Sequence, residues 1–247
     1  TPSISASITA SIPAAVACED GVDLVFVLDY TSSMGSAIET VRNSISTISS
    51  TLSSISGNNY RIGLVLFDEY SYASTPTYSS STFYSSLPSS QRIRIENGAN
   101  DFQLFTVMNL MSSNNELDIQ NTLDILDADN NSIGMVLGGG SNGPEPSDIA
   151  SFLVGTKSQS YYENVNTNTF PVEIAGSFRT NAAKFVVLIT DQNPGNIYDN
   201  YTTNQSDIDN FVNGDLTNTL IYNGIKFALL RSSSVTDSLN NVVTATG

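Results

Sequence analysis

The chain has 247 residues, of which 40% are hydrophobic, a size that favours one large domain with its own core. Acidic residues outnumber lysine and arginine by 24 to 9, and the resulting net charge of -15 argues against nucleic acid and anionic lipid as partners while it favours cations. With no histidine and a single cysteine, Cys18, the sequence excludes a Ser-His-Asp hydrolase, a cysteine-rich metal cluster and a disulfide framework within this segment, so a bound metal should be a hard ion held by oxygen atoms.

Residues 1 to 17 are small, hydroxylated and interrupted by prolines, as in a linker or an extended edge segment. We expect one globular domain to occupy residues 18 to 247. Its first element is VDLVFVLD, residues 22 to 29, a continuous apolar run typical of a strand covered on both faces in a parallel sheet. Apolar residues then recur at helical spacing from Ile38 to Ile55, and Gly57 marks the end of this predicted helix.

The rest of the chain alternates between strand and helix patterns. Strands are predicted at 60 to 69, 182 to 191 and 224 to 232, helices at 117 to 126, 148 to 154 and 207 to 222, and edge strands at 91 to 95 and 102 to 108. The stretch from 71 to 83, rich in serine, threonine and tyrosine, predicts a long surface excursion. The alternation predicts an α/β fold, a Rossmann-like doubly wound and mainly parallel sheet with helices on both faces.

Oxygen-bearing side chains stand where two of the predicted strands end. Asp29 ends the first strand, Thr31 and Ser33 follow it in the next loop, and Asp191 ends a later strand. In an open parallel sheet, functional residues gather in the crevice beyond the carboxyl ends of the strands. If these two strands are neighbours, their carboxylates and hydroxyls form a site suited to a hard divalent cation.

The sequence of Asp29-x-Thr31-x-Ser33, after an apolar strand and before a helix, resembles the metal-ion-dependent adhesion site (MIDAS) of von Willebrand factor A (vWA) domains. Three further segments occur in the order found in the I-like domain of integrin β subunits: YRIGLVLFDE, GSNGPEPSDIA and GSFRTNAAKFVVLITD. The resemblance extends from about residue 21 to residue 247. It implies a vWA fold and a non-enzymatic, metal-dependent role in adhesion or ligand binding.

The resemblance also implies which residues hold the metal. Carried over by position, the ligands of Mg²⁺, or of Ca²⁺ or Mn²⁺, are Asp29, Thr31, Ser33, Glu145 and Asp191, the last through water. Integrin β subunits bind further ions through acids that are replaced here by Gly35, Ser36, Ala37 and Asn142. We therefore expect a single ion.

A cation held by few carboxylates keeps a position at which an acidic group of a partner can replace water. The resemblance thus implies a protein or glycan ligand on a cell or particle surface, and an extracellular, cell-surface or virion-surface location. The polar, tyrosine-bearing loops 71 to 90 and 156 to 180 are candidate contact surfaces, although solvated loops would have the same composition. The chain has no apolar run of about 18 residues that would predict a membrane span.

The end of the chain, SLNNVVTATG at 238 to 247, resembles the helix and Ala-x-Gly segment that precede the last strand of vWA domains. The resemblance implies that this segment is part of a longer chain. We expect the last strand and helix of the domain, and a partner for Cys18, to lie beyond Gly247.

Each candidate ligand has a plainer interpretation. Thr31 and Ser33 could cap the following helix, Asp191 could form a turn, and Glu145 could be an acid that favours a helix start. DADNNS, residues 127 to 132, has the spacing of a calcium loop, but its sixth position is serine and the position of the bidentate glutamate is glycine.

Two alternative functions are also consistent with the sequence. The first is a structural vWA domain in the assembly of a surface appendage or of a virion tail or fibre, without metal-bridged binding. The second is a Mg²⁺-dependent phosphatase, because VFVLDYT resembles the first motif of haloacid dehalogenases, in which the aspartate is the nucleophile. The second acid of that motif is replaced by Thr31, which disfavours the enzyme.

Overall fold

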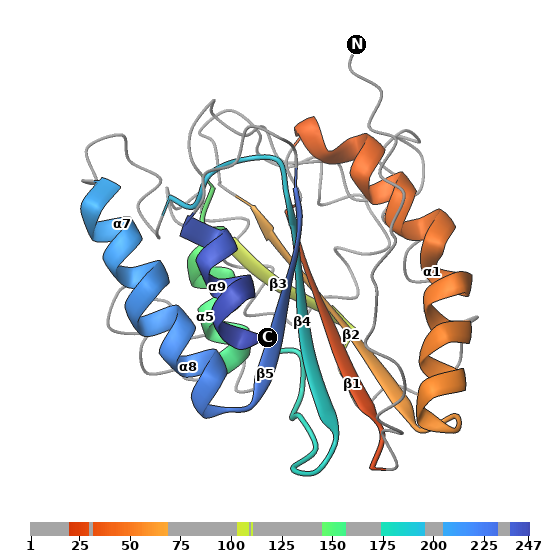
Figure 1. Ribbon diagram of the computed structural model, residues 1–247. Helices are drawn as coiled ribbons and strands as arrows, with labels where there is room; N and C mark the ends of the chain where they lie inside the picture. The colour runs from red at the N-terminus through yellow and green to blue at the C-terminus, as the bar shows by residue number, and fades with distance from the viewer. Residues whose placement is uncertain are drawn as a thin grey trace.

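The computed structural model describes residues 20–29, 32–68, 103–108, 110, 145–156, 174–195, 205–231 and 238–247. Its strands form one sheet in the order β3-β2-β1-β4-β5 (Figure 1). Their bounds are β1 Val22–Asp29, β2 Tyr60–Asp68, β3 Gln103–Met108, β4 Ala183–Thr190 and β5 Ile225–Arg231. Four of these strands are parallel, and β3 runs antiparallel to β2 at one edge.

Helices cover both faces of this sheet (Figure 1). One face carries α1, Gly35–Ser56, and the other carries α5, Ser147–Thr156, with α7, Gln205–Phe211, α8, Thr217–Tyr222, and α9, Ser238–Thr246. The predicted doubly wound α/β fold is therefore confirmed. None of the helices in the described ranges is long and apolar enough to cross a membrane.

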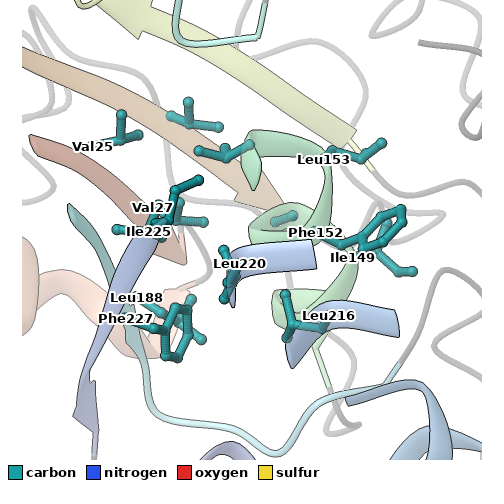
Figure 2. Packing of buried hydrophobic residues seen from close by; sticks show 14 of the residues in the cluster. Val25, Val27, Ile149, Phe152, Leu153, Leu188, Leu216, Leu220, Ile225 and Phe227 are labelled. Carbon is teal, nitrogen blue, oxygen red and sulfur yellow. The ribbon is translucent and has the colours of Figure 1, made fainter. Parts of the chain in front are cut away.

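The apolar run of β1 reflects its place at the centre of the sheet. Val25 and Val27 pack with residues of α5, β4, α8 and β5 on one face, as Figure 2 shows, whereas Leu24, Phe26 and Leu28 pack on the face covered by α1. Alternate residues of a strand point to opposite faces, so both sets had to be apolar. The prediction of a strand buried on both faces is confirmed.

The helix α1 is amphipathic, as its periodicity predicted. Its buried stripe runs along Ile38, Val41, Ile45 and Leu52 and contacts the sheet. It ends at Gly57, which adopts a left-handed conformation with φ of 59°, a backbone geometry that glycine enters at little cost.

Most predicted elements match the structure closely. The strands at 60 to 69, 182 to 191 and 224 to 232 correspond to β2, β4 and β5, the edge strand at 102 to 108 is β3, and the helix at 148 to 154 is α5. The segments 1 to 17, 71 to 83, 91 to 95, 117 to 126 and 127 to 132, and also Cys18, Thr31 and Asn142, lie outside the described residues.

The helix predicted at 207 to 222 is present, but a π-helical turn, Val212–Leu216, separates α7 from α8. The hydroxyl of Thr217 donates a hydrogen bond to the carbonyl oxygen of Val212 at 2.7 Å, across this wider turn. The widened turn lies beside α5 and α9, so it forms part of the packing between these helices.

The predicted C-terminal helix is α9, which packs against β5. The hydroxyl of Thr246 accepts a hydrogen bond from the backbone N–H of Phe227 at 3.1 Å, and Lys226 Nζ donates to the carbonyl oxygen of Gly247 at 2.8 Å. Within the described ranges, no strand pairs with the outer edge of β5. A further strand beyond Gly247 stays a prediction.

A buried ion-pair cluster stands at the amino end of the sheet. The fully buried carboxylate of Asp23 accepts hydrogen bonds from Arg61 Nε at 2.9 Å and Nη2 at 2.5 Å, and from Arg179 N at 2.6 Å and Nε at 2.9 Å. Arg179 also bonds Asn59 and the carbonyl of Val22. This cluster ties β1, β2 and the segment before β4 together.

Candidate metal centre

The candidate site lies where the strand order of the sheet reverses. β1 pairs in parallel with β2 on one side and with β4 on the other, and Leu28 stands opposite Ile189 near the carboxyl ends. Asp29 is the last residue of β1, and Asp191 directly follows β4. The strands that these two acids end or follow are therefore neighbours, which was the condition for a shared site. Such a reversal point is where open α/β sheets bind ligands.

Asp29 is held by a residue that sequence reasoning missed. Its carboxylate is fully buried, and Oδ2 accepts a hydrogen bond from the hydroxyl of Thr190 at 2.9 Å. The same hydroxyl accepts a hydrogen bond from the backbone N–H of Gln192 at 3.2 Å. Thr190 therefore links the end of β1 to the loop that contains Asp191. Its place next to Asp191 was a usable signal, because a hydroxyl at one strand end can reach the neighbouring strand end.

The segment of Glu145 is fixed against that same loop. Its backbone N–H donates to the carbonyl oxygen of Asn193 at 2.8 Å, and its carbonyl oxygen accepts from the N–H of Gly195 at 2.8 Å. Between them, Glu145 forms an isolated parallel bridge with Pro194. The side chain of Glu145 is buried. The loop before α5 and the loop after β4 therefore lie side by side.

The first turn of α5 continues this polar region. Asp148 is fully buried and is the acid of that turn, so the helix-start role considered for Glu145 belongs to Asp148. Ser147 is also fully buried, and its N–H donates to the carbonyl oxygen of Glu145 at 2.7 Å. Neither Ser147 nor Asp148 was predicted as a site residue. Their position, two and three residues after a predicted ligand, was the only signal.

Ser33 lies in the short 3₁₀-helix Ser32–Met34, where it is exposed. The residue at the N-cap of α1 is Met34, whose side chain makes no capping hydrogen bond. The plainer interpretation required Ser33 to stand at the N-cap of α1, and it does not. Thr31, the other hydroxyl of this loop, is outside the described residues.

The carboxylates at this edge do not form a tight cluster. Among the residues that the structure describes, no three side chains of Asp, Glu, His or Cys lie close enough together to share one metal ion. Asp29 ends β1, and Glu145 and Asp191 stand on two loops of the same edge, so a cation among them would take part of its coordination from hydroxyl groups and water.

No family model and no curated protein matches the chain. The crystal form 2 structure of proximal thread matrix protein 1 from the mussel byssus matches with a TM-score of 0.51 at 13% identity, over 92% of this chain and 42% of that chain. This likeness shows a vWA-like α/β fold.

Two further structures match with lower scores. The mussel matrix protein with a zinc-occupied MIDAS motif has a TM-score of 0.46 at 13% identity, over 92% of this chain and 40% of that chain. Manganese-loaded TRAP protein of Plasmodium vivax has a TM-score of 0.47 at 14% identity, over 92% of this chain and 63% of that chain. The chain thus spans less than two thirds of the length of each of these proteins.

Proposed function

We propose that this domain is a metal-dependent ligand-binding module, in which one divalent cation at the carboxyl edge of the sheet bridges to an acidic group of a protein or glycan partner. One observation carries the proposal. The backbone of Glu145 is hydrogen-bonded on both sides to the loop after Asp191, and Thr190 in that same region holds the carboxylate of Asp29. Three segments far apart in sequence thereby bring acids to one edge.

The residues proposed to hold the ion are Asp29, Thr31, Ser33, Glu145 and Asp191. Because the carboxylates are spread over three separate segments, few of them would contact the ion directly. The ion would then keep positive charge and an exchangeable water position. The donor set contains only oxygen, and this favours Mg²⁺, Mn²⁺ or Ca²⁺ over zinc, which prefers nitrogen and sulfur ligands.

An acidic partner group follows from the electrostatics. A chain of net charge -15 repels an anionic ligand over most of its surface. A bound cation reverses the local potential at one point, so it would determine where an acidic side chain or sugar can dock. We propose that this takes place outside the cell or on a cell or virion surface.

Direct measurement of metal binding tests the proposal. Calorimetric titration with MgCl₂ or MnCl₂ should show one site in the wild-type protein and none in Asp29→Ala. Asp20→Ala is the matched control, because Asp20 is an exposed acid near the opposite end of β1 and should leave binding unchanged. Undiminished affinity in Asp29→Ala, or no saturable binding by the wild type, would contradict the metal site.

The role in adhesion needs a partner. Candidate surface proteins and glycans can be screened for capture by the immobilised domain in Mg²⁺ and in EDTA. Capture should be lost in EDTA, restored by Mg²⁺ or Mn²⁺, and absent in Glu145→Ala. Tyr30 stands between Asp29 and Thr31 in the sequence, and we expect it at the rim of the site and not among the ligands, so Tyr30→Ala should weaken capture and leave the ion bound. Capture that is indifferent to EDTA would instead support the alternative of a structural domain in a surface assembly, which the likeness to a thread matrix protein favours.

We propose binding and not catalysis for this site. A phosphatase of the haloacid dehalogenase type needs its nucleophilic aspartate to be reached by the substrate. Asp29 is fully buried and hydrogen-bonded to Thr190, a position suited to holding a small ion and not to attacking a phosphate ester. Turnover of a generic aryl phosphate in the presence of Mg²⁺ would contradict this.

A further inference from the structure

Two buried hydroxyl groups in the described part of the chain have no hydrogen-bond partner, those of Ser49 and Ser147. Other buried serines do have one. Ser56 donates to the carbonyl oxygen of Leu52 at 2.6 Å, and Ser151 donates to that of Ser147 at 2.8 Å. A buried hydroxyl without a partner costs free energy, so it requires an explanation such as an ion or a water molecule.

The two hydroxyls differ in their surroundings. Ser49 lies in the apolar stripe of α1, between Ile45 and Leu52, which pack against the sheet. Ser147 begins α5, two residues after Glu145 and directly before the buried Asp148. Apolar neighbours give no reason for an ion near Ser49, whereas acidic neighbours do so for Ser147.

Backbone hydrogen bonds tie the start of α5, and Ser147 with it, to the loop after β4 that contains Asp191. The N–H of Ser147 bonds the carbonyl oxygen of Glu145, and that same oxygen bonds Gly195 in the loop after β4. α5 packs against β1 and β4, the two strands whose ends carry Asp29 and Thr190. Being first in its helix, Ser147 also lacks the preceding helical carbonyl that Ser151 uses.

We infer that the hydroxyl of Ser147 is a further oxygen group of the cation site, next to the five residues already proposed. The inference rests on the proposed function, because the ion is the one that Asp29 and its companions hold. Acids at the start of α5 would repel an anion from this helix end, while a cation relieves their mutual repulsion and gives the hydroxyl oxygen a partner.

A matched pair of variants tests the inference. Ser147→Ala and Ser49→Ala each remove one buried oxygen that has no partner in the protein. Calorimetry with MgCl₂ should show an affinity lowered about tenfold or more in Ser147→Ala, the scale seen when a group that supports a metal site is removed. Ser49→Ala should bind as the wild type does.

Thermal unfolding gives a second test, because the effect of Ser147→Ala on stability should depend on whether the ion is present. Without divalent ions, Ser147→Ala should be at least as stable as the wild type, because an unsatisfied polar group is gone. With saturating MgCl₂, the ion-induced rise in melting temperature should be smaller than in the wild type. A purely structural serine would lower stability equally with and without the ion.

A cysteine exchange sharpens the test. A thiolate prefers Zn²⁺ to Mg²⁺, so Ser147→Cys should shift selectivity towards Zn²⁺, and Ser49→Cys should not. Wild-type affinity in Ser147→Ala, with binding lost in Asp29→Ala, would overturn the inference and leave the proposed function standing. Equal losses in Ser147→Ala and Ser49→Ala would also overturn it. A wild-type protein that binds no ion would overturn both.

Discussion

The two ends of β1 each carry a fully buried aspartate, and the two aspartates have different hydrogen-bond partners. At the amino end, Asp23 is enclosed by two guanidinium groups whose side chains are 18% and 27% exposed. At the carboxyl end, Asp29 accepts a hydrogen bond from a neutral hydroxyl, and the acids Glu145 and Asp191 stand on the adjoining loops. One end brings positive charge to its acid, whereas at the other end two further acids stand on adjoining loops of the same edge.

This contrast separates stability from binding. The charge of Asp23 is satisfied within the protein, and its cluster ties three separate segments together, so its role is structural. At the other end, acids from separate segments share one edge without forming a tight cluster, and a cation bound there as proposed would link them. Parallel α/β sheets place ligands at the carboxyl end, which agrees with this division.

The largest effect is expected at the amino end. Asp23→Asn leaves two arginines around a neutral group and should lower the free energy of unfolding by about 3 kcal/mol. Urea denaturation at pH 7 measures it. Asp20→Asn, which changes an exposed acid three residues earlier, should stay within about 0.5 kcal/mol of the wild type. An equally small effect of Asp23→Asn would contradict the structural role of the Asp23 cluster.

The pH dependence of stability should show the same cluster. Burial raises the pKa of the Asp23 carboxyl, but hydrogen bonds from Arg61 and Arg179 outweigh it, so the pKa lies below its ordinary value. A folded-state pKa below the unfolded one stabilises the protein at higher pH, and this contribution is lost as the pH falls below about 4. The stability difference between wild type and Asp23→Asn should therefore shrink from pH 5 to pH 2. A constant difference over that range would exclude an ionised Asp23 as its source.

A smaller effect is expected at the carboxyl end. Thr190→Val removes the hydroxyl that donates to Asp29 and should cost about 1.5 kcal/mol, the usual scale for a hydrogen bond to a charged group. Thr190→Ser keeps the hydroxyl and serves as the control. If the ion is bound as proposed, Mg²⁺ should recover part of the stability lost in Thr190→Val. If Thr190→Val lowered the free energy of unfolding as much as Asp23→Asn does, the two ends of β1 would contribute equally to stability.

The smallest change should be a gain. Ser49→Ala removes a buried hydroxyl without a partner and adds helix propensity, so the free energy of unfolding should rise by about 1 kcal/mol. Ser56→Ala on the same helix face gives the comparison, because Ser56 has a hydrogen bond to lose. If Ser49→Ala destabilises the protein instead, a buried hydroxyl without a partner is not unfavourable here. The missing partner of Ser147 would then be no sign of a bound ion.

Much of the fold could be predicted because its signals are local. The apolar run of β1, the stripe from Ile38 to Leu52 and the stop at Gly57 depend on neighbours a few residues away. The same holds for the position of Asp29 and Asp191 at strand ends. The identity of Asp29, Glu145 and Asp191 as metal ligands came from a resemblance and stays a prediction.

The sequence by itself determined which segments form strands and helices, since burial on one or two faces imposes a period on the apolar residues. Only the tertiary structure decided that β1 lies between β2 and β4, and hence that Thr190 reaches Asp29 and that Arg61 and Arg179 meet on Asp23. Arg179 is 156 residues from Asp23, and no local pattern connects them. Such contacts depend on the order in which strands pair, and pairing order is set by the packing of the whole chain, so the unpartnered hydroxyl of Ser147 could be recognised only once α5 was placed against the sheet.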